Sequence, residues 1–210
     1  MLFRSLLVGA FCGMIMSLIH AFASISLNAD QTISGTGINL IVNGITIFMA
    51  QILFNADRTQ PYQMGMKPIM SIGGIYPTAF IALAVVLIVW FVMYKLPFGL
   101  RLRACGEHPQ AAASVGIKVK KIRYIAVLTS GFLGGLAGGC LVLTQTIQFT
   151  STTINGTGFI ALAAVSFGRW RPAGISLSSL LFGAAVAFSI YVVNIPSLKN
   201  LLPSEFFSLL

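Results

Sequence analysis

Four polar side chains recur along one side of an otherwise apolar stretch, residues 33–51. They stand at positions i, i+3, i+7 and i+10 and are Thr36, Asn39, Asn43 and Thr46. An α-helix rises about 1.5 Å per residue, so it would carry them along one face for about 15 Å. Hydroxyl and carboxamide groups donate and accept hydrogen bonds. The pattern indicates either bonds to neighbouring helices or the lining of a water-filled substrate pathway.

The sequence offers no set of residues for covalent or metal catalysis. It contains no H-E-x-x-H motif, no G-x-S-x-G motif and no G-x-x-x-x-G-K-[ST] phosphate loop. Its two histidines, His20 and His108, are far apart and neither has a partner at metal-ligand spacing. We therefore expect no catalytic residue, no metal site and no cofactor on this chain. Energy for uphill transport would have to come from a partner.

Composition places the chain in a lipid bilayer. It is 57% hydrophobic and 8% charged with a mean hydropathy of +0.92, whereas soluble domains are roughly 25% charged. Five stretches contain no Asp, Glu, Lys or Arg, and each reaches the roughly 20 residues that cross the hydrocarbon core. They are residues 5–29, 31–56, 68–94, 124–168 and 172–198. The sequence predicts an all-α integral membrane protein, a bundle of about five to six transmembrane helices in a single domain over residues 1–210.

The residues missing from these spans exclude further functions. No Asp, Glu, Lys or Arg lies deep in a predicted span, whereas proton relays need such residues inside the membrane. We therefore do not expect a proton-driven transporter. Cys12, Cys105 and Cys140 are odd in number and widely spaced. We interpret them as small apolar side chains rather than a disulfide framework.

The net charge of +9 is concentrated in one loop, residues 95–123. Seven of the thirteen basic residues lie there, namely Lys95, Arg101, Arg103, Lys118, Lys120, Lys121 and Arg123. Such clustering between two spans indicates membrane orientation rather than nucleic-acid binding, and the positive-inside rule places the loop in the cytoplasm. Alternation then puts the turn at 28–31 and Arg169 inside, and the N-terminus outside. Residues 158–168 are too few to span straight, so we expect a half-helix or a tilted span that starts near Thr153.

Glycines recur at four-residue steps in the span that follows this loop. They are Gly131, Gly135 and Gly139. In lipid, this spacing lets two helix backbones approach closely. The sequence therefore predicts a helix-packing face here, with a hinge or a ligand-facing groove as the alternative.

The loop itself contains the signals of a short helix. Pro109 stands where a first helical turn tolerates proline, residues 110–115 are mostly good helix formers, and Gly116 stands where a left-handed cap would end the helix. We expect two turns of helix, about 10 Å long. Its small alanine face suits insertion into a groove on another protein. The flanking cations could hold the loop against anionic lipid headgroups. The alternative is that the helix is a plain surface connector.

Three stretches resemble one known family of membrane proteins. They are "GLRLRACGEHPQAAASVGIKVKKIRYIAVLTSGFLGGLAGG" (99–139), "DQTISGTGINLIVNG" (30–44) and "GTGFIALAAVSFGRWRPAG" (156–174). In this order they resemble the conserved segments of bacterial ABC importer permeases that serve nucleosides, ribose and other simple sugars, and branched-chain amino acids. The resemblance runs from about residue 28 to 175, and the segment at 30–44 favours nucleosides.

The resemblance implies a coupling helix between Gly106 and Ile117 that docks on a separate ATP-hydrolysing subunit. Carried over by position, the docking element comprises Gly106, Glu107, Ala111, Ala112, Gly116 and Ile117. It also implies a second permease subunit, homologous or identical, an extracytoplasmic substrate-binding protein, and a multi-pass location in the bacterial cell membrane. Such permeases usually have further spans, so the chain looks truncated. A sugar importer, a non-transport membrane scaffold and a passive channel are the alternatives.

Overall fold

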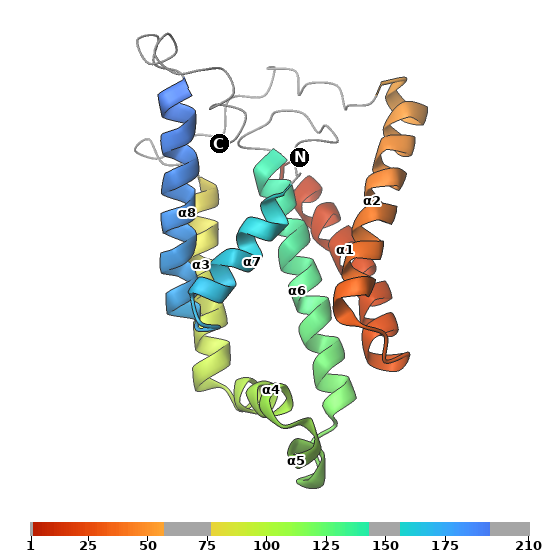
Figure 1. Cartoon of the computed structure of the whole chain (residues 1–210), viewed down its shortest axis with the longest axis vertical. Coiled ribbons are helices and arrows are strands. Elements are labelled where there is room, and N and C mark those ends of the chain that lie inside the picture. Colours follow the sequence, from red (N-terminus) through yellow and green to blue (C-terminus); the bar gives the residue numbers. More distant parts are fainter. Residues whose placement is uncertain (1, 57–76, 143–155, 194–210) are drawn as a thin grey trace. The chain divides into compact units, whose positions relative to one another are not determined.

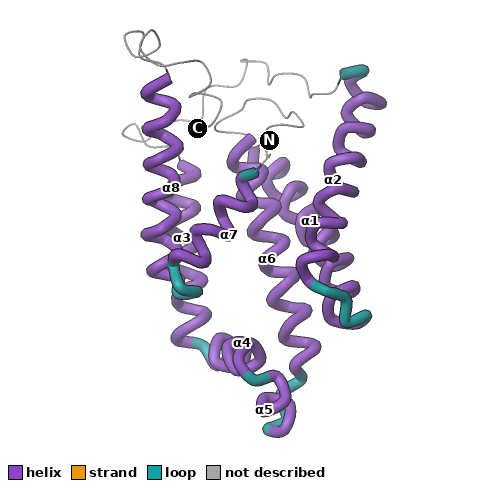
Figure 2. The backbone as a smooth tube through the Cα atoms, viewed as in Figure 1, coloured by secondary structure: helices purple, strands orange, loops and turns teal. Residues whose placement is uncertain are grey.

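The computed structural model describes residues 2–56, 77–142 and 156–193, and these residues are helical with short connections (Figures 1 and 2). The helices are α1 (Leu2–Ala21), a π-helical turn η1 (Phe22–Ser26), α2 (Gln31–Phe54), α3 (Pro77–Lys95), α4 (Pro97–Glu107), α5 (Pro109–Ser114), α6 (Val119–Leu141), α7 (Thr157–Phe167) and α8 (Pro172–Val193). The described residues contain no strand. The all-α prediction is confirmed.

Within the described residues, four helical segments are long and apolar enough to cross a bilayer. They are Arg4–Ser26, Gln31–Phe54, Pro77–Lys95 and Val119–Leu141. Helix α8 has 22 residues and α7 has 11, so α7 is the half-length helix that the sequence allowed for. Its start at Thr157 follows Gly156, whose φ of 82° only glycine adopts readily.

The chain divides into two compact units, Met1–Asn155 and Gly156–Leu210. In the first unit, α1 packs antiparallel to α6 at glycine contacts. A Cβ atom built on Gly135 would lie 2.9 Å from the Cα atom of Ala10, and one on Gly131 would lie 2.7 Å from the carbonyl oxygen of Gly13. Nearer the end of α6, a Cβ atom on Gly139 would meet Leu6 at 3.1 Å. The backbones approach this closely because neither helix carries a bulky side chain at the crossing.

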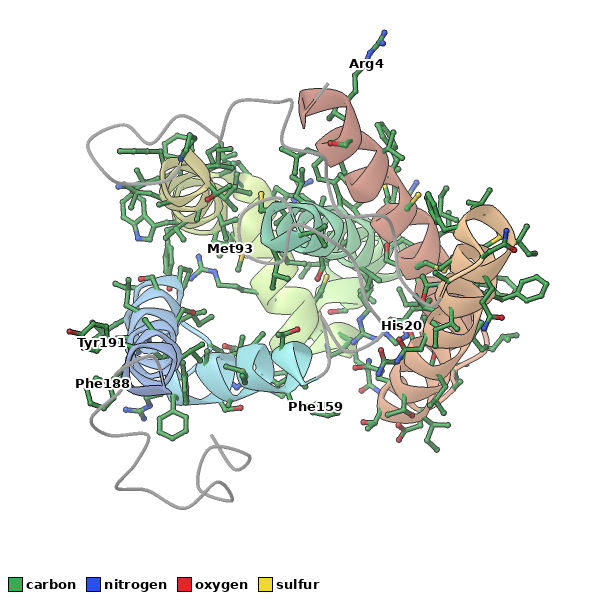
Figure 3. The ribbon with its side chains drawn as sticks, turned by 90° about the horizontal axis from the view of Figure 1, so that it is seen from above. Arg4, His20, Met93, Phe159, Phe188 and Tyr191 are labelled. Carbon is green, nitrogen blue, oxygen red and sulfur yellow. The ribbon has the colours of Figure 1, made fainter. Side chains whose placement is uncertain are left out.

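Side-chain hydrogen bonds join α1, α2 and α6 at one end of this unit. The Nδ1 atom of His20 lies 3.0 Å from the Oγ atom of Ser34, and Figure 3 shows His20 where α1 meets α2. The hydroxyls of Ser26 and Tyr124 are 2.5 Å apart. Asp30 caps α2 by accepting from the backbone N–H groups of residues 32 and 33 at 2.7 and 3.1 Å.

This geometry agrees with the alternation inferred from charge. The turn after α1 lies beside the start of α6 because Ser26 meets Tyr124, so it shares its side of the bilayer with α4 and α5. The start of α1 lies beside the end of α6, where Leu6 approaches Gly139. Arg4 therefore lies at the opposite end of α1 from His20 (Figure 3).

Helix α4 begins directly at the foot of α3. Leu96 has an extended backbone and Pro97 occupies the first helical position, where its missing N–H group costs nothing. Gly99 packs against the backbone carbonyls of Val92 and Met93, which leave no space for a Cβ atom. This close approach turns the chain sharply out of the direction of α3 (Figure 1).

In the second unit, α7 and α8 form a tight helical hairpin. Gly168 and Gly174 bring their backbones into contact, and the Oγ atom of Ser178 donates to the carbonyl of Ala164 at 2.6 Å. Arg169 and Trp170 adopt left-handed backbone with φ of 51° and 58°. Two such residues in succession reverse the chain within one turn.

Little of the described chain forms a conventional core. Its buried hydrophobic residues are Ala10, Ala21, Ile25, Ala50, Cys105, Ala112, Ile122 and Ala164, and no polar residue is buried among those described. The large apolar side chains of α2, α3 and α8 are mostly exposed. In a bilayer this apolar surface faces lipid or other membrane helices, where it carries no penalty.

Candidate functional site

The basic loop folds into two short helices that share one break. Helix α4 ends at Glu107, and α5 begins at Pro109 after His108, whose φ of −136° interrupts the helical path. Gly116, with φ of 84°, ends α5. Its N–H group donates to Ala113 at 3.0 Å, and the N–H of the next residue donates to Ala112 at 3.1 Å. The helix between proline and glycine is therefore present as the sequence predicts.

A small apolar cluster holds the two helices to the start of α6. Cys105 from α4, Ala112 from α5 and Ile122 from α6 are 1%, 4% and 9% exposed. The partly buried side chains packed around them are Leu102, Ile117 and Val119. The guanidinium of Arg123 also donates to the carbonyl of Cys105 at 3.4 Å. The α4–α5 unit, residues 97–118, is thus packed on α6.

The six predicted docking residues divide into an outer and an inner set. Gly106, Glu107, Ala111 and Gly116 are exposed, Ile117 is half-buried and Ala112 is buried. Ala112 faces the cluster inside the chain, so its methyl group is not offered to another protein. Ala111 and Ala113 are exposed, and they flank Ala112 on two different sides of α5.

Helix α4 is the element that sequence reasoning missed, because residues 97–107 were expected to be part of a loop. The signal was present: Pro97 fits a first helical turn, and Leu100 to Ala104 are good helix formers. Two arginines and a glycine interrupt the apolar residues of this segment, so its helical pattern is hard to see in the sequence. As a result, Gly106 and Glu107 belong to the end of α4, while the other docking residues belong to α5 and its cap.

The polar stripe lies on α2, apart from the α4–α5 unit. Thr36, Asn39 and Asn43 are exposed and Thr46 is half-buried. The Thr36 hydroxyl donates to the carbonyl of Thr32 at 3.0 Å and the Thr46 hydroxyl to that of Val42 at 2.8 Å, so both threonines are satisfied within the helix.

The two asparagines of the stripe differ from the threonines. Within the described residues, neither the Asn39 nor the Asn43 carboxamide has a hydrogen-bond partner, and both lie on the side of α2 away from Ser34 and α1. An amide without a partner in hydrocarbon costs several kcal/mol, roughly 4–8 on a cyclohexane scale. These two groups therefore need water, a ligand or another helix beside them.

The third predicted set, Gly131, Gly135 and Gly139, lies on the face of α6 that meets α1. Gly134 and Gly138 lie on the adjoining side of the same helix, where an added Cβ atom would have nothing within 4 Å. The glycines at four-residue spacing are thus the ones in close contact with α1. The described residues contain no group of three His, Cys, Asp or Glu side chains that could hold a metal ion.

Comparison with known proteins agrees with this architecture. The family model described as the permease component of branched-chain amino acid transport systems matches residues 1–208. The guanosine ABC transporter permease protein NupQ of Bacillus subtilis is 42% identical over 210 residues, which cover 94% of this chain and 66% of the relative. The nucleoside ABC transporter permease protein NupC of Lactococcus lactis is 40% identical, covering 96% of this chain and 67% of the relative.

A more distant relative comes from an archaeon. The putative glucose ABC transporter permease protein TsgC13 of Haloferax volcanii is 34% identical over 87% of this chain and 59% of its own length. No solved structure matches the chain significantly. The chain spans about two thirds of the length of the two bacterial permeases. Because the family model covers residues 1–208, the chain belongs to the family of permease components of branched-chain amino acid transport systems.

Proposed function

We propose that this chain is a membrane-spanning permease subunit of an ATP-driven ABC importer for nucleosides, located in the bacterial cell membrane. The observation that carries the proposal is the similarity of nearly the whole chain to permeases named for guanosine and nucleoside transport, at 42% and 40% identity. The chain itself is not an enzyme in this proposal. A separate ATPase subunit hydrolyses ATP, and a second permease subunit and an external substrate-binding protein complete the importer.

The α4–α5 unit supports the coupling part of the proposal. It is short, packed on α6 through Cys105, Ala112 and Ile122, and exposed along Ala111 and Glu107. A rigid unit of this kind passes the movement of an attached ATPase to a transmembrane helix without absorbing it. Closure of the ATPase would then tilt α6, and α1 would follow because its backbone is locked to α6 at the glycine contacts.

The α2 asparagines support a polar pathway. Asn39 and Asn43 have no partner within the described residues, and a carboxamide offers both donors and acceptors. Nucleosides present ribose hydroxyls and base edges that need both. This pairing of chemistry makes α2 the helix that lines the proposed path.

Import of a simple sugar is the second candidate. It is favoured by the similarity to TsgC13, which is 34% identical and is named as a putative glucose transporter permease. A sugar offers hydroxyl groups alone, which the same carboxamides would bind. A membrane scaffold without transport activity would use the two asparagines for hydrogen bonds to other helices.

The test is uptake by cells that express this chain with its ATPase, companion permease and binding protein. We expect uptake of labelled guanosine that excess unlabelled nucleosides inhibit and excess ribose or glucose does not. If excess sugar inhibits the uptake and excess nucleoside does not, the substrate is a sugar and not a nucleoside. If no uptake occurs although the subunits co-purify, the chain is a structural subunit and the transport proposal is wrong.

Two variants separate coupling from the pathway in the same assay. Ala111→Asp places a charge on the exposed face of α5 and should weaken recovery with the ATPase by about tenfold or more, while the matched Ala111→Ser should not. Asn43→Leu should leave recovery of the ATPase unchanged and lower uptake. Loss of assembly with Asn43→Leu would show that α2 uses this residue for helix packing instead.

A further inference from the structure

Three side chains form a contiguous group where α3 meets α4. The guanidinium carbon of Arg103 lies 4.9 Å from the centre of the Tyr94 ring. The Trp90 ring lies one helical turn before Tyr94, with the two ring centres 6.3 Å apart. A cation at this distance from an aromatic ring is attracted by its quadrupole. Arg103 is therefore oriented toward the end of α3 by the Tyr94 ring.

The group lies at the depth of the lipid headgroups. Helix α3 spans from Pro77 and ends at Lys95, so Trp90 and Tyr94 occupy its last two turns. Tryptophan and tyrosine concentrate at this level of a membrane because one end of each side chain is apolar and the other is polar. The positive charge of the following loop places this end of α3 in the cytoplasm.

The positive charges of the group are not neutralised within the described residues. Lys95 and Arg103 are both exposed, and neither forms an ion pair in the described part of the chain. Glu107 is the only acidic residue between residues 77 and 142. It lies one turn beyond Arg103 on α4 without pairing with it. These two charges are therefore free to bind an external anion.

Apolar surface lies next to the cations. Leu100 is 65% exposed and stands three residues before Arg103, on the same side of α4, and Leu96 is 40% exposed. Free phosphate or an acidic peptide would leave these leucines in water. A phospholipid would cover them with its acyl chain while its phosphate meets the guanidinium.

We propose that the α3–α4 junction is a binding site for an anionic phospholipid of the cytoplasmic leaflet. The lipid phosphate binds Arg103, which Tyr94 orients, and Lys95 adds a second positive charge. The acyl chain lies along Trp90 and Leu100. A zwitterionic lipid fits less well because its ammonium group would be repelled by Arg103 and Lys95, neither of which is paired with an acid in the described part of the chain. The site is independent of the transported substrate.

The experiment uses Trp90 fluorescence. The chain has two tryptophans, so Trp170→Phe leaves Trp90 as the one reporter. The full chain is reconstituted in phosphatidylcholine nanodiscs that contain increasing fractions of phosphatidylglycerol brominated near the glycerol end of its acyl chains. Bromine quenches tryptophan on contact. A matched series uses brominated phosphatidylcholine in the same amounts.

We expect half-maximal quenching at a lower mole fraction of phosphatidylglycerol than of phosphatidylcholine. Arg103→Gln should raise the phosphatidylglycerol midpoint about fivefold, the loss expected for one cation at a membrane surface. Arg101→Gln is the matched control, because it removes the same charge from α4 two residues away, on another side of the helix. It should shift the midpoint less than Arg103→Gln does, because Arg101 does not contact the bound phosphate in this proposal.

Two results would overturn the proposal. Equal quenching by the two brominated lipids in the unsubstituted site would show that no anionic lipid is selected. Equal midpoint shifts for Arg103→Gln and Arg101→Gln would show that the loop attracts anionic lipid by its overall charge, without a site at the α3–α4 junction.

Discussion

Two kinds of glycine share helix α6, and they have opposite physical consequences. Gly131 and Gly135 face α1, where a Cβ atom would clash with backbone atoms. Gly134 and Gly138 face open space. At the first pair, the absent side chain allows contact between two backbones, which is a main source of helix association in lipid. At the second pair, glycine only lowers helix propensity.

This difference predicts opposite signs for the same substitution. Gly135→Ala should destabilise the protein by about 1–3 kcal/mol, because the backbone of Ala10 cannot move away without separating the helices. Gly134→Ala should be neutral or stabilise it by up to about 1 kcal/mol through helix propensity. The measurement is thermal unfolding of both variants in one detergent. Shifts of equal sign and size would contradict the assigned packing face.

The α4–α5 unit is held together by the buried cluster on the side that faces α6. Cys105, Ala112 and Ile122 come from three helices and exclude solvent together. Arg123 adds a hydrogen bond to the Cys105 carbonyl. The unit therefore keeps its shape without a partner, and a docking protein meets a preformed surface at little cost in conformational entropy.

Because Cys105 is buried in this cluster, we predict that thiol reagents modify it slowly. In a chain with Cys12→Ala and Cys140→Ala, Cys105 is the one remaining thiol and is 1% exposed. Maleimide labelling should be slow, because it requires local opening. Ala112→Asp should speed it about tenfold or more by burying an unpaired charge, whereas Ala111→Asp, on the exposed side, should not. Equal rates for the two variants would mean that the cluster does not hold the loop.

At the scale of the first unit, the helices alternate in direction across the bilayer. Ser26 meets Tyr124 at one end and Leu6 approaches Gly139 at the other, so α1 crosses the full length of α6. The basic loop and the start of the chain consequently lie on opposite sides of the membrane. If the 95–123 loop is cytoplasmic, as the positive-inside rule predicts, Arg4 lies outside, against the charge preference of that residue alone.

This arrangement predicts one-sided labelling by a membrane-impermeant thiol reagent. In a chain whose three cysteines are replaced by alanine, Arg4→Cys should react in intact cells. Lys118→Cys, next to α5, should react only after permeabilisation. Each variant serves as the control for the other, because the two cysteines should be reached by the reagent from opposite sides of the membrane. Reaction of both from the same side would mean that α1 does not cross the membrane as packed here.

Several features could be predicted from sequence because they depend on local composition. Uncharged stretches give the spans, since the cost of a charge in hydrocarbon is set residue by residue. Pro109 and Gly116 give the bounds of α5, since both act through their own backbone. The four-residue spacing of Gly131 and Gly135 gives the packing face for the same reason. Helix α4 could have been predicted as well, and its arginines obscured it.

The sequence by itself thus determined the membrane class, the orientation of the basic loop and the family resemblance, all of which arise from neighbouring residues. Only the tertiary structure decided that Ala112 faces inward and Ala111 outward, because the difference depends on where α4 and α6 place Cys105 and Ile122. It also decided that Arg103 lies over Tyr94. A contact between two helices depends on the angle of the turn between them, here set by the backbone contact of Gly99 with α3, and no local pattern encodes that angle.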